Sequence, residues 1–172
     1  MGYMDLYVLA DALSQVKGKV IVWLGSCGSG AAIYEDGVPQ NGDDALAAVA
    51  LKTFAAYDRM ATQPVTGDDA EGLLPRTGEF RKEGKFYVLT AARYHEMSWG
   101  LGSDEYNFFG QFLTEGITKT NGNMPADADQ DGKVTQHELF LYVKEREEDA
   151  ENFIYQNVQE YPVNSDYVLF GN

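Results

Sequence analysis

The sequence predicts an α/β domain built on a mostly parallel sheet, and two similar segments carry this prediction. Residues 19–24, KVIVWL, form a short β-branched and aromatic run that we interpret as a strand buried on both faces. Residues 85–90, KFYVLT, form a second run of the same kind. Each run ends in small residues and a predicted helix separates them, which is typical of neighbouring parallel strands.

The composition excludes several classes of protein. The chain has 172 residues, 44% of them hydrophobic, which is enough for one globular domain with a core. Its net charge of −14 disfavours nucleic acids and anionic membranes as partners, since no basic patch is available to neutralise phosphates. No apolar run approaches the roughly 20 residues of a membrane span, and the first residues lack the basic stretch of a signal peptide.

Apolar residues at three- and four-residue spacing predict four helices. These cover residues 4–16, from Asp43 or Asp44 to about Met60, 107–118, and from the end of an acidic loop to about Glu148. We interpret residues 34–84 as an insertion or linker, because most of the segment is loop by composition and residues 61–84 are rich in Gly and Pro. The charged stretch 144–151 predicts a solvated helix face, and residues 167–170 predict a last strand at a sheet edge.

A glycine-rich turn, GSCGSG at residues 25–30, follows the first predicted strand. Small residues allow a sharp turn and the close approach of a ligand. Cys27 is the single cysteine of the chain, so no internal disulfide forms. A thiol at the carboxyl end of a buried strand lies where open α/β sheets bind ligands, but a free cysteine can equally be a small buried hydrophobic residue. Its position alone does not separate a nucleophile from such a filler.

An acidic loop at residues 127–138 fits the calcium-binding pattern D-x-D-x-D-G-x-x-x-x-x-E of an EF-hand-like loop. Gly132 makes the turn, and the predicted Ca²⁺ ligands are Asp127, Asp129, Asp131, Lys133 through its carbonyl, Thr135 and Glu138. The alternative is an acidic turn before a helix, since Thr135 and Glu138 also form a capping box. Because the sequence holds no second loop, we expect a structural cation rather than a calcium sensor.

The order of these motifs resembles the caspase-like cysteine peptidases, which include caspases, metacaspases, legumains and clostripain-like bacterial enzymes. The resemblance rests on S-C-G-S-G at 26–30, on T-A-A-R-Y-H-E-M-S-W at 90–99, on the aromatic helix that follows and on the acidic loop. Gly25 stands where the family usually has an acidic residue. The resemblance implies a three-layer αβα caspase-like sandwich with a mostly parallel sheet, apparently lacking its first strands. Residues 1–172 would then be the second half of the peptidase domain.

The resemblance also implies an activity, that of a cysteine endopeptidase with a Cys-His dyad. Cys27 would be the nucleophile, and its backbone N–H would be an oxyanion donor. The family's histidine lies upstream of the cysteine, whereas His95 and His137 lie downstream. We therefore expect the general base on a histidine-bearing amino-terminal half or subunit outside this chain.

The substrate expected from the resemblance is a peptide or protein. Ser98 and Trp99 would form a wall of the primary specificity pocket, and Asp104 and Glu105 follow where legumain-type relatives place an acidic pocket residue. An acidic pocket favours cleavage after a basic residue. The resemblance further implies a secreted or cell-envelope protein of a bacterium.

Two alternatives to a peptidase remain. The first is a catalytically inactive caspase-like scaffold or binding domain that calcium stabilises. The second is another cysteine hydrolase or an amidotransferase with a nucleophile elbow, which would need glycine where Ser29 stands.

Overall fold

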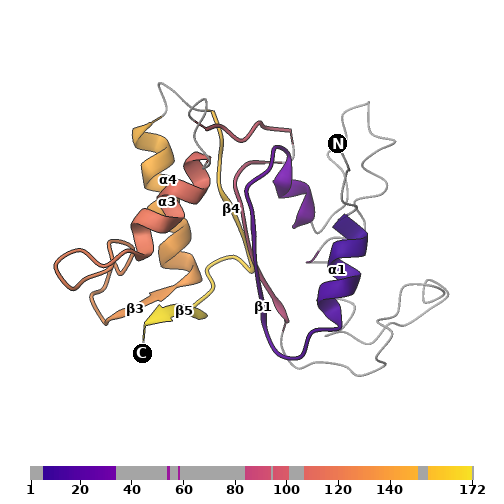
Figure 1. Ribbon diagram of the computed structural model, residues 1–172, viewed down its shortest axis with the longest axis horizontal. Coiled ribbons are helices and arrows are strands. Elements are labelled where there is room, and N and C mark those ends of the chain that lie inside the picture. The colour runs from indigo at the N-terminus through magenta and orange to yellow at the C-terminus, as the bar shows by residue number, and fades with distance from the viewer. Residues whose placement is uncertain are drawn as a thin grey trace. The chain divides into compact units, whose positions relative to one another are not determined.

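The computed structural model describes residues 6–33, 54, 58, 84–93, 95–100, 107–150 and 155–171 (Figure 1). The chain divides into two compact units, one of Met1–Val22 with Ala31–Tyr87 and one of Trp23–Gly30 with Val88–Asn172. The predicted insertion at 34–84 and the helix predicted to end near Met60 lie almost wholly outside the described residues. Within that stretch, Phe54 and Asp58 are described and have helical backbone.

Helix α1 (Leu6–Ser14) opens the first unit and confirms the first predicted helix. The helix ends earlier than its apolar spacing indicates, since the N–H groups of Gln15 and Val16 donate three residues back, each at 3.2 Å, instead of four. The Ser14 hydroxyl also donates to the Asp11 carbonyl at 2.6 Å. Ala10 is buried, whereas Val16 lies beyond the helix and is exposed. The predicted apolar stripe therefore stops short of Val16.

Strands β1 (Val20–Leu24) and β2 (Phe86–Thr90) are hydrogen-bonded neighbours. They run parallel, since the Val20 N–H donates to Lys85 O at 2.8 Å and the Ala91 N–H donates to Leu24 O at 2.9 Å. Burial along nearly all of β2 agrees with the prediction. The same prediction is wrong for β1, where Val20 and Val22 are buried while Ile21 and Trp23 are exposed. That alternation is typical of a strand with one covered face.

A buried carboxylate anchors the start of β2 within the first unit. Asp58 accepts the backbone N–H groups of Lys85 at 2.7 Å and Phe86 at 3.0 Å. The rings of Phe54 and Phe86 lie 4.8 Å apart, so Phe54 supplies an apolar contact to the strand beside the polar contacts of Asp58.

Helices α3 (Phe108–Ile117) and α4 (Gln136–Asp149) pack side by side in the second unit (Figure 1). Both confirm predicted helices. The close approach depends on Gly116, because a Cβ atom there would lie 2.9 Å from the Tyr142 ring. The core of this unit consists of Leu89, Ala91, Phe109, Phe112, Leu113, Met124, Ala126, Val134, Leu139, Val143 and Val158.

Three short strands complete the second unit. Strand β4 (Gln159–Tyr161) pairs antiparallel with β2, and Leu89 lies opposite Glu160. Strands β3 (Lys133–Thr135) and β5 (Val168–Gly171) form a separate antiparallel pair. The predicted last strand at 167–170 therefore exists, but its neighbour is the strand inside the acidic loop.

The predicted three-layer αβα sandwich with a mostly parallel sheet is wrong. The described residues form two small sheets, a three-stranded one in the order β1-β2-β4 and the two-stranded β3-β5 pair, and only β1 and β2 run parallel. The prediction failed because β4 has only three residues, Gln-Glu-Tyr, which carry no strand pattern. Each helix in the described part of the chain is too short or too polar to cross a membrane.

Candidate functional site

The cysteine turn, residues 25–30, follows directly from β1. Gly28 has a φ of +64°, in the left-handed region where glycine is favoured, and so reverses the chain. The Ser29 N–H donates to Ser26 O at 3.3 Å, and a short 3₁₀ helix, η1 (Ser29–Ala32), begins there. Cys27 lies at the tip and is exposed. The thiol is therefore open to solvent and is not a buried hydrophobic filler.

Backbone hydrogen bonds join the cysteine turn to the loop after β2. We call residues 91–93 and 95–100 of this loop the pocket loop. The Gly28 N–H donates to Glu96 O at 2.8 Å, and the Gly30 N–H donates to Ala92 O at 2.8 Å. Since β1 and β2 are parallel, their carboxyl ends meet at one sheet edge, and these bonds bring the two segments together there.

Ser98 is the residue of the pocket loop that contacts Cys27. Its backbone N–H donates to Cys27 Sγ at 3.3 Å, and Sγ lies 3.9 Å from Ser98 O. Asn107 holds this arrangement from the start of α3. Its Nδ2 donates to Ser98 Oγ at 3.2 Å and to Gly25 O, while its Oδ1 accepts the Gly110 N–H at 2.8 Å and caps the helix.

The structure places two of the four predicted substrate-binding residues. Ser98 lies against Cys27, and Trp99 follows it with 38% of its surface exposed. Asp104 and Glu105 lie outside the described residues. The chain thus brings the thiol and the predicted pocket wall together. That Asp104 or Glu105 selects a basic substrate side chain stays a prediction.

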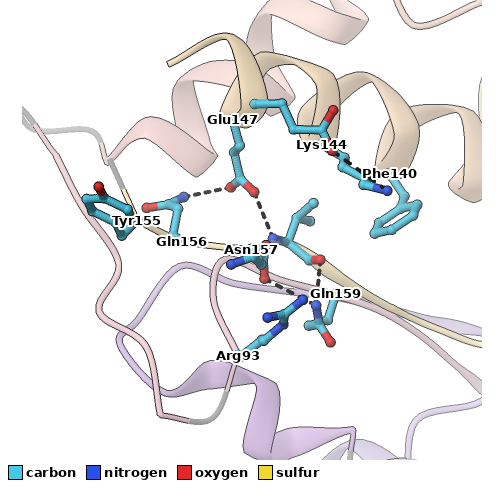
Figure 2. Close-up of a pocket in the computed structure, with 10 residues that line it drawn as sticks. Arg93, Phe140, Lys144, Glu147, Tyr155, Gln156, Asn157 and Gln159 are labelled. Carbon is cyan, nitrogen blue, oxygen red and sulfur yellow. Dashed lines mark hydrogen bonds and ion pairs between the residues drawn. The ribbon is translucent and has the colours of Figure 1, made fainter. Parts of the chain in front are cut away.

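A pocket of about 320 Å³ lies beside the pocket loop, between it and α4 (Figure 2). Two of its lining residues are hydrogen-bonded to each other, since Gln156 Nε2 donates to Glu147 Oε1 at 2.7 Å, and Gln156 Oε1 accepts the Trp99 N–H at 2.7 Å. Glu147 Oε2 also accepts the Val158 N–H at 2.8 Å. The pocket is lined by Arg93, Phe140, Lys144, Glu147, Glu148, Tyr155, Gln156, Asn157, Val158 and Gln159.

Glu147 is the most perturbed acid of the site. Burial raises its pKa to about 7, although hydrogen bonds from Gln156 and Val158 oppose the rise, and the charge of Glu96 adds to it. The prediction that the whole stretch 144–151 is a solvated face is wrong here, since Glu147 is only 4% exposed. The missed signal is its spacing, because Glu147 continues the buried face of Leu139 and Val143 at four-residue intervals.

The two histidines occupy different surroundings. His137 Nδ1 lies 2.8 Å from Glu160 Oε1, and its ring stacks on Phe140. The His137 side chain is therefore half-buried, with 31% of it exposed. His95 lies exposed in the pocket loop.

The acidic loop brings three predicted ligands together. The carboxylates of Asp127, Asp129 and Asp131 each place an oxygen within 4.8 Å of the others. Asp127 accepts the N–H groups of Asp131 at 3.1 Å and Gly132 at 3.0 Å, and Gly132 turns the chain with a φ of +87°. Three clustered carboxylates form an oxygen donor set that suits a hard cation such as Ca²⁺.

The remaining predicted ligands are engaged within the protein. Glu138 Oε2 accepts the N–H and hydroxyl of Thr135 at 2.9 and 2.8 Å, and Oε1 accepts the Ala128 N–H at 3.1 Å. Burial favours the neutral acid, but these hydrogen bonds prevail and lower the pKa of Glu138. The side chain of Lys133 lies 3.8 Å from Asp131. The capping box and the aspartate cluster thus occur together, so the two interpretations of the loop are compatible.

No protein-family model matches this chain, and neither does a curated protein or a solved structure. The resemblance to cysteine peptidases therefore stays a prediction from the motifs, and a function has to be argued from the residues and their geometry.

Proposed function

We propose that this chain is part of a cysteine endopeptidase in which Cys27 is the nucleophile. The observation that carries the proposal is the exposed thiol at the carboxyl end of β1, with its sulfur held against the Ser98 N–H. A strand end and a tight turn present the sulfur outward at a fixed position, which a nucleophile requires. The adjacent Ser98 and Trp99 offer a surface on which a substrate side chain can rest.

The proposed reaction is acyl transfer in two steps. Cys27 attacks the scissile carbonyl as thiolate, and the amine leaves with a proton from the conjugate acid of the general base. Water, activated by the same base, then hydrolyses the thioester and returns the thiol. The Cys27 backbone N–H would stabilise the oxyanion of the tetrahedral intermediate. We assign the base to a histidine outside this chain, with His95 as the in-chain alternative.

Two further features belong to the proposal. Cleavage after arginine or lysine follows if Asp104 or Glu105 lines the primary pocket, because a carboxylate there favours a cationic side chain.

Asp127, Asp129 and Asp131 would hold a structural Ca²⁺, which would stabilise the loop between α3 and α4. The cation takes no part in the proposed chemistry.

Covalent labelling tests this proposal on the chain as it stands. A peptidyl acyloxymethyl ketone that ends in arginine should label Cys27 at least about tenfold faster than its aspartate counterpart, as read by mass spectrometry. Cys27→Ala should abolish labelling, and Ser26→Ala is the matched control. If His95 is the base, His95→Ala will slow labelling, whereas His137→Ala will not.

Other results would overturn the proposal. Equal labelling by both probes would remove the substrate preference. If labelling stays no faster than that of free glutathione even after a histidine-bearing amino-terminal half is added, Cys27 is not an activated nucleophile and the scaffold interpretation is favoured.

A further inference from the structure

A continuous series of contacts joins Glu147, on α4, to the sulfur of Cys27. Glu147 accepts from Gln156, Gln156 accepts from the Trp99 backbone, and the preceding residue, Ser98, donates to Cys27 Sγ. The two side chains in the series are nearly inaccessible, with Glu147 4% and Gln156 5% exposed. Buried polar contacts of this kind resist exchange with water, so the series is a stable part of the site.

The direction of each hydrogen bond depends on the charge of Glu147. As a carboxylate, Glu147 only accepts, and it takes one N–H from Gln156 and one from Val158. The amide nitrogen of Gln156 must therefore face Glu147 (Figure 2). This leaves the amide oxygen to face the Trp99 N–H. A protonated Glu147 gains one O–H donor, and without its negative charge it accepts the Gln156 N–H more weakly than a carboxylate does. Gln156 can then accept from it only by turning its oxygen away from Trp99.

We propose that Glu147 and Gln156 are positioning residues for Cys27, and that the ionised carboxylate keeps the Ser98–Trp99 backbone in the orientation that points the Ser98 N–H at the sulfur. This inference rests on the proposed role of Cys27 as a nucleophile. It adds that the reactivity of Cys27 depends on the charge of Glu147, a carboxylate that does not contact the sulfur.

A second contact supports the same arrangement. The carboxylate of Glu96 accepts the N–H of Asn157 at 3.0 Å and its Nδ2 at 2.8 Å, and Glu96 O accepts the Gly28 N–H. Residues 156 and 157 therefore hold the pocket loop at two points, one on each side of Ser98. A shift of this short segment would be transmitted to both partners of the cysteine turn.

The titration of Glu147 falls in the neutral range, because its pKa is raised to about 7. Positioning should therefore be complete above neutral pH and be lost below it. Other charged or titratable groups around the pocket could contribute to a pH profile. They are Glu96 and Arg93 on the pocket loop, Lys144 and Glu148 on α4, and Tyr155.

The experiment measures the rate of alkylation of Cys27 by iodoacetamide in the full chain, as a ratio of wild type to variant at each pH. The ratio removes the rise in rate with pH that every thiol shows and leaves the part that depends on position 147. For Glu147→Gln, which mimics the protonated acid, we expect a ratio of about five at pH 8, falling to one at about pH 5.5. Glu145→Gln removes an exposed charge of the same helix outside the pocket and should give a ratio of one throughout.

A second measurement protects the test against a variant that fails to fold. The protection of the Trp99 amide against hydrogen exchange, measured relative to the intrinsic exchange rate at the same pH, should fall in Gln156→Ala and, below neutral pH, in the wild type. The double variant Glu147→Gln/Gln156→Ala should exchange no faster than Gln156→Ala alone, because both changes break one series.

A ratio that is constant with pH, or additive effects in the double variant, would overturn the inference. Failure of the proposed peptidase is distinguishable, since a thiol that never alkylates in the native chain leaves the Trp99 exchange result intact.

Discussion

The acidic loop and the cysteine turn are built from contacts of very different range. In the loop, Asp127 bonds to backbone groups four and five residues away, and Glu138 reaches back ten residues to Ala128. The contact between Cys27 and Ser98 spans 71 residues of sequence, and that between Gly25 and Asn107 spans 82. The loop geometry therefore follows from one short stretch, whereas the cysteine turn is organised only when the second unit folds.

The acids of the two regions also differ in exposure. The three aspartates of the loop are exposed or half-buried and face one another, so their cost is mutual repulsion that a cation would relieve. Glu147 is buried, and its cost is the loss of water around a single charge. The stability contributed by Glu147 should therefore depend on pH, and the stability contributed by the three aspartates should depend on calcium.

The largest expected effect is the pH dependence of stability due to Glu147. Its pKa is about 7 in the folded chain against a usual value of 4.5. Between these values the unfolded chain releases a proton that the folded chain keeps, so stability falls as the pH rises from 4.5 to 7. Above that window the cost is constant, at about 3 kcal/mol. Below it Glu147 is protonated in both states and contributes nothing.

Urea unfolding of the wild type and of Glu147→Gln across this range measures the effect. Relative to the wild type, the free energy of unfolding of Glu147→Gln should rise by about 3 kcal/mol as the pH goes from the acid end of this range to the alkaline end. Glu148→Gln is the matched control and should run parallel to the wild type. A parallel profile for Glu147→Gln as well would mean that Glu147 is not the titrating group.

The difference in contact range also explains what the sequence could predict. The ligand spacing of the loop, the capping box at Thr135 and the helix after it are local patterns, and the structure contains the geometry of each. Cys27 and its turn were predictable as a feature, but their partners were not. Asn107 fits a helix N-cap in the sequence, but its contacts with Gly25 and Ser98 follow from no local pattern. Gln156 has no local pattern at all, because its role depends on a strand and a helix that meet only in the fold.

The sheet shows the same limit. Strands β1 and β2 carry dense β-branched and aromatic residues and were predicted, whereas β4 is polar and short and was missed. A strand of this kind forms because a neighbouring strand offers unpaired backbone groups, as β2 does to β4. The architecture changes from the predicted parallel sheet to a mixed one through this single strand.

The second effect is stabilisation by calcium. A cation that binds only the folded chain should add about 2.7 kcal/mol at a hundredfold excess over its Kd. For a chain of this size that corresponds to a rise in Tm of about 5–10 °C. Thermal unfolding in chelator and in millimolar calcium measures it. An unchanged Tm would mean that the aspartate cluster is only a turn.

Two variants sharpen the calcium measurement. Asp129→Asn keeps an oxygen for the Asp131 N–H but removes one charge, so it should abolish the calcium shift. In chelator it should stabilise the chain slightly, by about 0.5 kcal/mol, because repulsion falls. Glu145→Ala removes an exposed acid outside the loop and should leave the calcium shift unchanged.

The smallest effect concerns Asn107, the residue that joins the cysteine turn to α3. Asn107→Ala removes the helix cap and the donor to Gly25 and Ser98, which should cost about 2 kcal/mol. Asn107→Ser retains a capping oxygen and loses only the donor, so about half of the cost should return. Urea unfolding measures both, and alkylation of Cys27 should change equally in the two variants because each releases Ser98. If Asn107→Ser restores the ordinary alkylation rate as well as the stability, the Asn107 donor is unnecessary for the cysteine turn and α3 alone holds the pocket loop.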